Sequence, residues 1–418
     1  MINNLSLLLF REKSFVKTIF YVMIAIGFLL LLFFTLNRNT HTLWFDEQWY
    51  LDNVIILKNY GVSKQFILEV KGPAGPLHAI IHYLFLPLTD LKLPYIRLIN
   101  IGFTLPILFV LYRIHKLLKA KNAIAATLGF FAVPMIYVCT GMALTEIPAM
   151  LFAVLSYLFL IYSLESKSAI KSYLFAIVAG TFLSIAILGR QPYLMLCLAV
   201  LVYIFPIKTY QKRLPLLITF LVFSLIMPAY VFGIWQNIQP AIESQTGKGF
   251  QIFHGILAFA YAFIIILFLS PNWISYPKIK HISLTFLIIT AVNGIFLKER
   301  FLPMMSTANK YFNEYFTGIF SLLFASTVML FSILFLYSCL QYFFNNINNK
   351  HNLFILLATV FILATSAKIT HQFSSRYIVQ AVPFIILITK SHIALNPLKL
   401  LATFIGISIG IISLNSYF

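Results

Sequence analysis

The segment FVKTIFYVMIAIGFLLLLFFTL (residues 15–36), followed by WFDEQWY (residues 44–50), decides the class of this protein. The first segment is long enough to cross the hydrocarbon core of a bilayer, which takes about 20 apolar residues. It exceeds the apolar core of a signal peptide, about 7–15 residues, and no A-x-A cleavage site follows, so it predicts an uncleaved first span. The second segment places two adjacent carboxylates among four aromatic rings just beyond that span.

The rest of the chain has the same apolar character. Of its 418 residues, 61% are hydrophobic and 10% are charged, and the mean hydropathy is +0.92. A soluble domain has roughly 45–50% apolar and about 25% charged residues. The composition therefore excludes a soluble enzyme, a disordered chain and a secreted disulfide scaffold. It predicts an all-α polytopic membrane protein in which residues 1–418 form a single integral-membrane domain.

Apolar segments long enough to span recur along the whole sequence. We expect about 13 transmembrane helices, within a range of 11 to 14. They fall at residues 15–36, 97–114, 122–141, 143–163, 170–189, 192–207, 214–236, 250–270, 281–297, 317–344, 352–368, 377–390 and 398–416. Residues 77–88 are also apolar, but a stretch of this length is more typical of an interfacial or re-entrant segment.

The distribution of charge fixes the expected topology. The net charge is +19, from 30 basic and 11 acidic residues. If residues 77–88 do not span, most Lys and Arg residues fall in loops on the side of the N-terminus, as the positive-inside rule requires. Nine of the eleven acids then lie outside, and residues 37–95 form a long first outer loop that contains surface helices. The basic excess thus indicates topology and not nucleic-acid binding.

The first candidate site is the pair Asp46–Glu47. Desolvation at a membrane surface raises the pKa of a carboxylate toward that of a general base, and the rings of Trp44, Trp49 and Tyr50 suit the faces of a sugar. The alternative is an interfacial aromatic belt with two solvated acids, and composition alone favours that alternative slightly.

Two later turns carry charge at the expected membrane boundary. Glu146, in GMALTEIP (residues 141–148), is either a carboxylate that complements a helix dipole or a second active-site acid. Arg190, in GRQP (residues 189–192), needs a partner at this depth, which a phosphate or Glu146 would supply. The structural alternative for Arg190 is snorkelling to the interface.

Further cations occur in segments expected outside, against the general trend. The turn KGPAGP (residues 71–76) either aims Lys71 at a phosphate or only joins a loop to a helix. Two other segments, residues 246–254 and 368–377, add the candidates Lys248, His254, Lys368, His371, Arg376 and Tyr377. His78 and His82 have the i,i+4 spacing of metal ligands, but we interpret them as core or interfacial histidines. The sequence has no Walker loop, GxGxxG, HExxH or Cys-based metal motif.

The order of these motifs resembles the GT-C superfamily of integral-membrane glycosyltransferases. In that superfamily an Asp-Glu pair opens the long first outer loop, as Asp46-Glu47 does here, and a Lys-x-Pro segment such as Lys71-Gly72-Pro73 precedes a surface helix. Residues 144–149 are similar to its second acidic site, and residues 376–384 are similar to its Arg-Tyr…Pro pattern. The resemblance spans most of the chain and implies 11–13 spans and a polyprenyl- or dolichyl-phosphate sugar donor.

Mannosyl- and arabinosyltransferases of the superfamily share these features, but some segments look closer to its α-1,2-glucosyltransferases. Residues 189–191 match an Arg-Gln turn of that group. The chain departs from it at residues 247–249, where an Asp is missing, and at residues 374–377, where Ser-Ser-Arg-Tyr replaces Asn-Arg-His-Tyr. Glucose and an N-glycan acceptor are therefore not implied.

The resemblance implies an inverting transfer to an acceptor hydroxyl. Asp46 would act as general base, Glu47 or Glu146 would orient the base or the acceptor, and Arg190 and Arg376 would bind the donor phosphate. Lys71, Lys248 and Lys368 are secondary phosphate ligands, and the expected substrate contacts are Trp44, Trp49, Tyr50, Gln191, His254, His371 and Tyr377. No cofactor is required, although a divalent cation is compatible with the mechanism.

A secondary transporter is the first alternative, and a lipid-carrier-linked glycan ligase, polymerase or flippase is the second. Transporters often have internal repeats and ionisable groups at mid-membrane. This chain has no evident repeat, and its ionisable residues fall at the outer ends of spans. The short loops favour a bacterial cytoplasmic (inner) membrane, with the site on the outer face serving a cell envelope glycan. The expected partners are the bilayer, a polyprenyl-phosphate sugar and a lipid, glycan or protein acceptor, but no nucleic acid.

Overall fold

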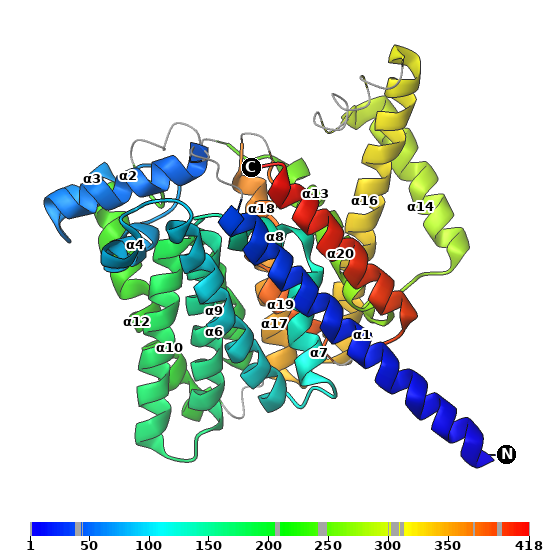
Figure 1. Ribbon diagram of the computed structural model, residues 1–418, viewed down its shortest axis with the longest axis horizontal. Helices are drawn as coiled ribbons and strands as arrows, with labels where there is room; N and C mark the ends of the chain where they lie inside the picture. The colour runs from blue at the N-terminus through cyan, green and yellow to red at the C-terminus, as the bar shows by residue number, and fades with distance from the viewer. Residues whose placement is uncertain are drawn as a thin grey trace.

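A computed structural model describes residues 2–37, 43, 45–204, 210–240, 249–299, 301, 309, 313–370, 373–390 and 395–417. Helices and turns account for this part of the chain, and it contains no β-strand. Most of the long helices stand side by side in one bundle, with several short helices lying across one end of it (Figure 1). The all-α membrane fold predicted from the sequence is confirmed.

Ten helices of the described part are long and apolar enough to cross a membrane, or eleven if one bent pair counts as a single span. The long helices are α1 (Ile2–Asn37), α6 (Tyr95–Leu117), α9 (Glu146–Glu165), α10 (Ala169–Gly189), α12 (Tyr210–Trp235), α13 (Ile252–Leu269), α14 (Ile279–Val292) with the π-turn η7 (Asn293–Leu297), α16 (Glu314–Asn345), α17 (Lys350–Ala364) with η8 (Thr365–Lys368), and α20 (Pro397–Asn415).

Within the described residues the count of ten or eleven lies at or just below the lower limit of the predicted range of 11 to 14 and does not confirm 13, because three expected spans are interrupted helices. Residues 122–141 form α7 (Ala123–Leu128), η1 (Gly129–Ala132) and α8 (Pro134–Gly141), and the chain bends by 75° before α8. Proline lacks the N–H that would continue the first helix, so Pro134 begins a new one. The described part of the expected span 192–207 is divided into η2 (Gln191–Leu194), α11 (Met195–Ala199) and η3 (Val200–Ile204), and residues 377–390 are divided into α18 (Arg376–Val379) and α19 (Val382–Ile388).

The helix α19 shows why composition overestimates the count. Each of its seven residues is buried within the bundle. An apolar segment buried against other helices has the same composition as one that crosses a bilayer, so hydropathy alone does not separate the two cases.

The expected first outer loop is a layer of short helices: α2 (Phe45–Tyr60), α3 (Lys64–Glu69), α4 (Leu77–Leu84) and α5 (Leu86–Thr89). The eight residues of α4 rise about 12 Å, too little to cross a bilayer, in agreement with the prediction that residues 77–88 do not span. Helices α2 and α3 lie across the ends of the bundle above α12 and α10 (Figure 1). This layer has an apolar core of its own. The indole of Trp235, at the end of α12, donates a 2.6 Å hydrogen bond to the Ile67 carbonyl of α3.

The bundle packs closely where its helices carry small residues. A side chain at Gly180 of α10 would meet the Phe220 carbonyl of α12 at 2.5 Å, and one at Gly406 of α20 would meet the Ala132 carbonyl at 2.1 Å. Glycine at such contacts lets helix backbones approach closely in a membrane, where apolar side chains gain little from leaving lipid. Cys139, Cys197 and Cys339 are buried and free.

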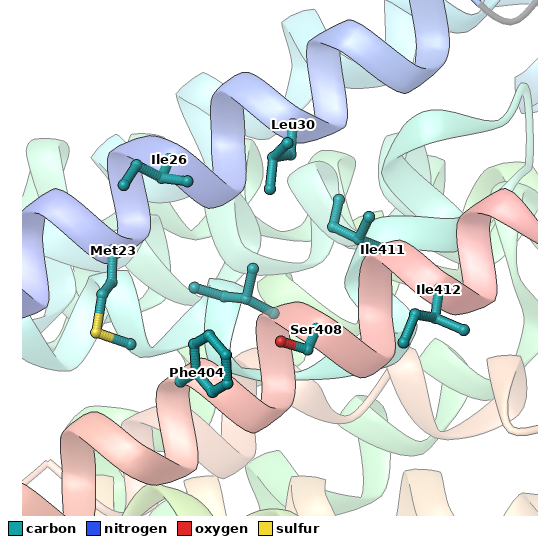
Figure 2. Close-up of a pocket in the computed structure, with 8 residues that line it drawn as sticks. Met23, Ile26, Leu30, Phe404, Ser408, Ile411 and Ile412 are labelled. Carbon is teal, nitrogen blue, oxygen red and sulfur yellow. The ribbon is translucent and has the colours of Figure 1, made fainter.

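Two regions of the bundle are more open. Helices α14 and α16 extend away from the other helices (Figure 1), and only 6% of the apolar window in residues 279–297 is buried. Between α1 and α20 an apolar groove of about 420 Å³ is lined by side chains of both helices, among them Met23, Leu30, Phe404 and Ile411 (Figure 2).

Candidate active site

Four charged side chains from distant parts of the sequence meet at the end of the bundle beneath the short helices. Asp46 is in the first turn of α2, Glu146 begins α9, Arg190 follows α10 and Arg376 begins α18. Arg376 pairs with Asp46 through Nη1, and its Nη2 lies 3.1 Å from Oε1 of Glu146. Arg190 donates to the same oxygen of Glu146. The two carboxylates and two guanidinium groups form one continuous network that is formally neutral.

The members of this network differ in their access to solvent. The side chain of Asp46 is 28% exposed, that of Arg376 is 12% exposed and that of Arg190 is 6% exposed. The side chain of Glu146 is completely buried. Asp46 is therefore the carboxylate of the network that a substrate can reach, and Glu146 lies behind it as the shared partner of two arginines.

Two buried atoms of the network have no hydrogen-bond partner in the described part of the chain. They are Nε of Arg190, a donor, and Oε2 of Glu146, an acceptor. Buried polar atoms are nearly always hydrogen-bonded in proteins, and an unpartnered charged group is especially costly. A donor and an acceptor left unused beside each other fit a site that a polar ligand completes.

Glu47 has a different environment from its neighbour Asp46. Arg97, near the start of α6, donates to Glu47 Oε1 from Nε at 2.8 Å and to Oε2 from Nη2 at 2.7 Å. The backbone N–H of Ala143 also donates to Oε1 at 2.8 Å. Both charged side chains are buried, with 2% or less exposed. The structure thus places Glu47 in a supporting position, tied to α6 and to the turn that precedes Glu146.

Arg97 was not among the residues that the sequence singled out. The sequence nevertheless contained a feature that could have identified Arg97. An arginine at the end of an apolar span on the expected outer side opposes the positive-inside rule. The same reasoning drew attention to Arg190 and Arg376. A systematic search for outer-side arginines at span ends would also have found Arg97.

The glycine-rich turn at residues 71–76 packs against the turn that carries Arg190. The amide of Gln191 donates to the Pro73 carbonyl at 2.8 Å. A side chain at Gly75 would meet the Leu188 carbonyl at 2.1 Å, so only glycine allows this approach. On the other side, the Asn53 amide exchanges two hydrogen bonds with the backbone of Lys71, at 2.7 and 2.8 Å. The turn therefore holds α2 and the Arg190 turn together.

The ammonium group of Lys71 points elsewhere. Its Nζ lies 3.4 Å from the carboxylate of Asp52, and the Lys71 side chain is half exposed. Lys368 is exposed at the end of η8. Neither lysine forms a hydrogen bond or ion pair with the four-residue network. The structure thus places Lys71 and Lys368, two of the three predicted secondary phosphate ligands, outside the network.

Aromatic and polar side chains surround the network. Tyr50 is buried one turn after Asp46, next to Gly72, which has a left-handed φ of 83° that favours glycine. Burial raises the pKa of the Tyr50 phenol. Trp49 and Tyr377 are partly buried. Tyr50 and Tyr377 are therefore within electrostatic reach of the charged groups, and Trp49 lies beside the glycine-rich turn.

The remaining predicted contacts are more distant or lie outside the described residues. His254 is held by its Nδ1 at 2.7 Å from the Ile369 carbonyl and packs against the ring of Phe373, on the segment that leads to Arg376. Trp44, Lys248 and His371 lie outside the residues that the structure describes.

His78 and His82 are core residues of the short-helix layer. Their rings stack with centroids 4.0 Å apart, and Nε2 of His78 lies 3.1 Å from the Ala143 carbonyl. Burial lowers the pKa of His78 to about 4 and holds that of His82 well below its usual range. Across the described ranges no group of three or more His, Cys, Asp or Glu side chains is arranged to hold a metal ion.

Residues 72–232 match the family model of dolichyl-phosphate-mannose-protein mannosyltransferases. The match includes Glu146, Arg190 and the glycine-rich turn, three parts of the site described above. That family is a GT-C mannosyltransferase family, so the match agrees with the resemblance that the sequence motifs carry. The match to this family agrees with the many apolar helices and with the carboxylates at the bundle end.

Two crystal structures of ArnT from Cupriavidus metallidurans are among the solved structures that match this chain. For the apo state, the TM-score is 0.44 at 10% identity, and the match covers 94% of this chain and 76% of ArnT. For the state bound to undecaprenyl phosphate, the TM-score is 0.46 at 10% identity, with 96% and 77% covered. None of the curated proteins is significantly similar in sequence.

Proposed function

We propose that this chain transfers a sugar from a polyprenyl-phosphate donor to an acceptor hydroxyl, with inversion at the anomeric carbon and with Asp46 as general base. The observation that carries the proposal is the network in which Arg376 joins the accessible carboxylate of Asp46 to Glu146 and Arg190. It supplies one base and two cations within a single hydrogen-bonded group.

Arg190 and Arg376 are the proposed ligands of the donor phosphate. A guanidinium group matches the oxygens of a phosphate, and such charge-assisted hydrogen bonds are stronger away from bulk water. The unpartnered Nε of buried Arg190 gives the phosphate a donor that no protein group uses in the described structure. Glu146 holds both arginines through Oε1, so its proposed role is to position them.

Asp46 then acts on the acceptor. When Arg376 turns toward the phosphate, the Asp46 carboxylate loses its partner and becomes a free base. Asp46 removes the proton of the acceptor hydroxyl while the hydroxyl oxygen bonds to the anomeric carbon. The bond between that carbon and the phosphate oxygen breaks, and the lipid phosphate leaves with the bonding electrons. Direct displacement inverts the anomeric centre, and a phosphate needs no protonation to leave, unlike the leaving group of a glycoside hydrolase.

The other site residues have supporting roles in this proposal. Glu47 orients Asp46 through its pair with Arg97, and Trp44, Trp49 and Tyr50 supply aromatic faces for the sugar. Gln191, His254, His371 and Tyr377 are the further substrate contacts, and Lys71, Lys248 and Lys368 remain secondary phosphate ligands. The mechanism does not require a metal ion, although it is compatible with a divalent cation.

The groove between α1 and α20 supports a donor with an apolar chain. Its walls are almost entirely aliphatic and aromatic, with Ser408 as a polar exception (Figure 2). The end of α20 approaches the charged network, because Tyr417 interacts electrostatically with Arg376 and Asp46. An isoprenoid chain in this groove would leave its phosphate near the two arginines.

We place the reaction on the outer face of a bacterial cytoplasmic membrane, with a lipid, glycan or protein as the acceptor. The positive-inside rule supports this orientation, since the network lies at the bundle end opposite the basic loops. A transporter would be expected to place its ionisable groups near mid-membrane. The convergence of the four charges at one end of the bundle therefore favours a transferase.

The decisive experiment is a transfer assay with the purified full-length protein in nanodiscs. The donors are a panel of radiolabelled polyprenyl-phosphate sugars, including undecaprenyl-phosphate pentoses and hexoses, and the acceptors are extracted envelope lipids and glycans. We expect one donor to release polyprenyl phosphate only when a competent acceptor is present, and we expect Asp46→Asn to abolish the release. The proposal fails if the natural substrate proves to be a solute that the protein transports unchanged, or a lipid-linked oligosaccharide that it handles intact.

A further inference from the structure

A second group of buried polar side chains lies at the opposite end of the bundle from the Asp46 network. Helix α6 begins near Arg97 and ends near His115, α17 begins near His351 and ends toward Lys368, and Lys390 follows the end of α19. The chain thus runs from one charged cluster to the other along three separate helices. In Figure 1, α6 and α17 reach the lower end of the bundle, where the second group lies, and α18 is at the upper end.

Lys390 has an unusual environment in this second cluster. Only 7% of the residue is exposed, and its Nζ donates a 2.7 Å hydrogen bond to the side-chain oxygen of Asn352. The Asn352 amide is fixed in turn by a 2.7 Å bond to Asn346. No carboxylate of the described residues forms an ion pair with Lys390. An ammonium group buried with one neutral partner is costly unless an anion compensates it.

His115 is the second unexplained group. It is fully buried in the last turn of α6, and neither of its ring nitrogens has a hydrogen-bond partner within the described structure. Lys390 is the charged group that interacts with it electrostatically. A buried imidazole within electrostatic reach of a buried ammonium group, with its ring N–H and its other ring nitrogen both unpartnered in the described structure, fits a site that accepts an anion.

Two more basic groups border the cluster. His351 interacts electrostatically with Lys390 and Arg213, and its Nδ1 lies 2.8 Å from the hydroxyl of Tyr203. Its Nε2 lies 3.8 Å from Glu165, whose carboxylate is half exposed and is the acidic group at this border. The first turn of α17 starts at the same place, and the N-terminus of a helix favours negative charge.

We infer that Lys390 and His115, bordered by Arg213 and His351, bind a phosphate group at this end of the bundle. A phosphate offers several acceptor oxygens, so one group can accept from the Lys390 ammonium, from a His115 ring N–H and from the N-terminus of α17. The same chemistry is present in the headgroup of an anionic phospholipid and in free phosphate. This site is separate from the proposed catalytic network and does not depend on the proposed function.

Lys399 shows what a compensated buried lysine looks like in the same protein. It is also buried, with 4% exposed, but its Nζ donates a 3.0 Å hydrogen bond to the Leu269 carbonyl at the end of α13. The carbonyl end of a helix carries partial negative charge, which stabilises a cation there. Lys399 therefore provides a matched control, since it is similarly buried and its ammonium group donates to a carbonyl at the end of a helix.

The test measures binding by thermal unfolding and does not use catalysis. Full-length protein is reconstituted in phosphatidylcholine nanodiscs, in nanodiscs that also contain phosphatidylglycerol, and in phosphatidylcholine nanodiscs titrated with inorganic phosphate. The same measurements are made on Lys390→Met, His115→Asn and Lys399→Met. We expect the anionic lipid or the phosphate to raise the unfolding temperature of the wild-type protein and of Lys399→Met, and to raise it far less in the other two variants.

The apparent affinity for the ligand should fall about fivefold in Lys390→Met, the factor that corresponds to about 1 kcal/mol for one cation near an anionic membrane. A response to phosphatidylglycerol but not to inorganic phosphate assigns the site to a lipid headgroup, and the reverse assigns it to free phosphate. If neither ligand stabilises the wild-type protein, or if Lys390→Met responds as Lys399→Met does, the inference is wrong.

Discussion

Arg97 donates hydrogen bonds to both carboxylate oxygens of Glu47, at 2.8 and 2.7 Å, although the two residues are 50 positions apart in the sequence. The pair ties the first turn of α2 to the first turn of α6 at a point where both side chains are buried. Asp46 precedes Glu47 directly in the same turn, so under the proposed function the pair holds the helix turn that carries the base. The catalytic proposal therefore depends on an ion pair that does not itself reach a substrate.

Removing one partner of this pair should destabilise the protein strongly. Arg97→Met leaves the Glu47 charge buried without its partner, and such a loss costs on the order of 3–5 kcal/mol. The double variant Glu47→Gln/Arg97→Met removes both charges and keeps an acceptor for the Ala143 N–H, so it should recover much of the lost stability. Unfolding by denaturant in a fixed detergent measures the free energies, and purely additive losses would contradict this account.

Replacement of the proposed base should stop transfer without disturbing the fold. Asp46→Asn keeps the size of the side chain and removes the proton acceptor, so kcat should fall by about 10²-fold or more. Arg376 retains Glu146 as a partner, and the yield of folded protein should be unchanged. Asp52→Asn on the same helix is the control, because Asp52 pairs with Lys71 outside the network and its replacement should leave kcat unchanged. Near-normal turnover by Asp46→Asn would remove Asp46 from the chemistry.

Replacing Arg190, a proposed ligand of the donor phosphate, should weaken the binding of the donor. Arg190→Lys retains a positive charge beside Glu146 but removes the unpartnered Nε. A charge-assisted hydrogen bond contributes about 1.5–3 kcal/mol, so the KM for the donor should rise roughly 10- to 100-fold while the KM for the acceptor changes little. Arg113→Lys, an exposed change at the other end of α6, is the control. An unaltered dependence on donor concentration would exclude Arg190 from the donor site.

The close contact between the glycine-rich turn and the Arg190 segment predicts that a side chain at Gly75 will be destabilising. Gly75→Ala would bring a methyl group to 2.1 Å from the Leu188 carbonyl, so the turn would have to move away from the Arg190 segment. Overpacking of this kind costs about 1–3 kcal/mol, and the unfolding temperature and donor binding should both decrease. Gly102→Ala has open space around it and should be neutral in both measurements. Equal behaviour of the two variants would show that the turn adapts freely.

Protonation of His78 predicts acid sensitivity of the short-helix layer. Its pKa is about 4 in the folded protein and 6.5 in the unfolded chain, so the unfolded chain binds the proton first as the pH falls. The free energy of unfolding is therefore unaffected by His78 above pH 6.5, and it falls by on the order of 3 kcal/mol as the pH is lowered from 6.5 to 4. His78→Gln keeps an N–H for the Ala143 carbonyl and should flatten the pH dependence of unfolding, whereas exposed His281→Gln should not. The same slope in His78→Gln and the wild type would refute this origin.

Much of the site could be predicted from the sequence because an ionisable residue at a membrane boundary stands out against an apolar background. Asp46, Glu146, Arg190 and Arg376 were identified in this way, and the structure brings all four together. Lys71 and Lys368 met the same criterion but lie outside the network, because position along the chain does not determine the direction of a long flexible side chain. Arg97 met it too and was overlooked.

The sequence alone determined the class of the protein, since apolar composition follows directly from the requirement that backbone groups in a bilayer be satisfied within helices. It also favoured a surface position for residues 77–88, because of their short length and the positive-inside rule, and the eight-residue helix α4 agrees with that expectation. The tertiary structure decided how many apolar segments are continuous helices, as a buried segment and a lipid-facing one have the same composition. It also decided which charges pair, because the partners are up to 330 residues apart and only the packing of the helices brings Arg376 to Asp46.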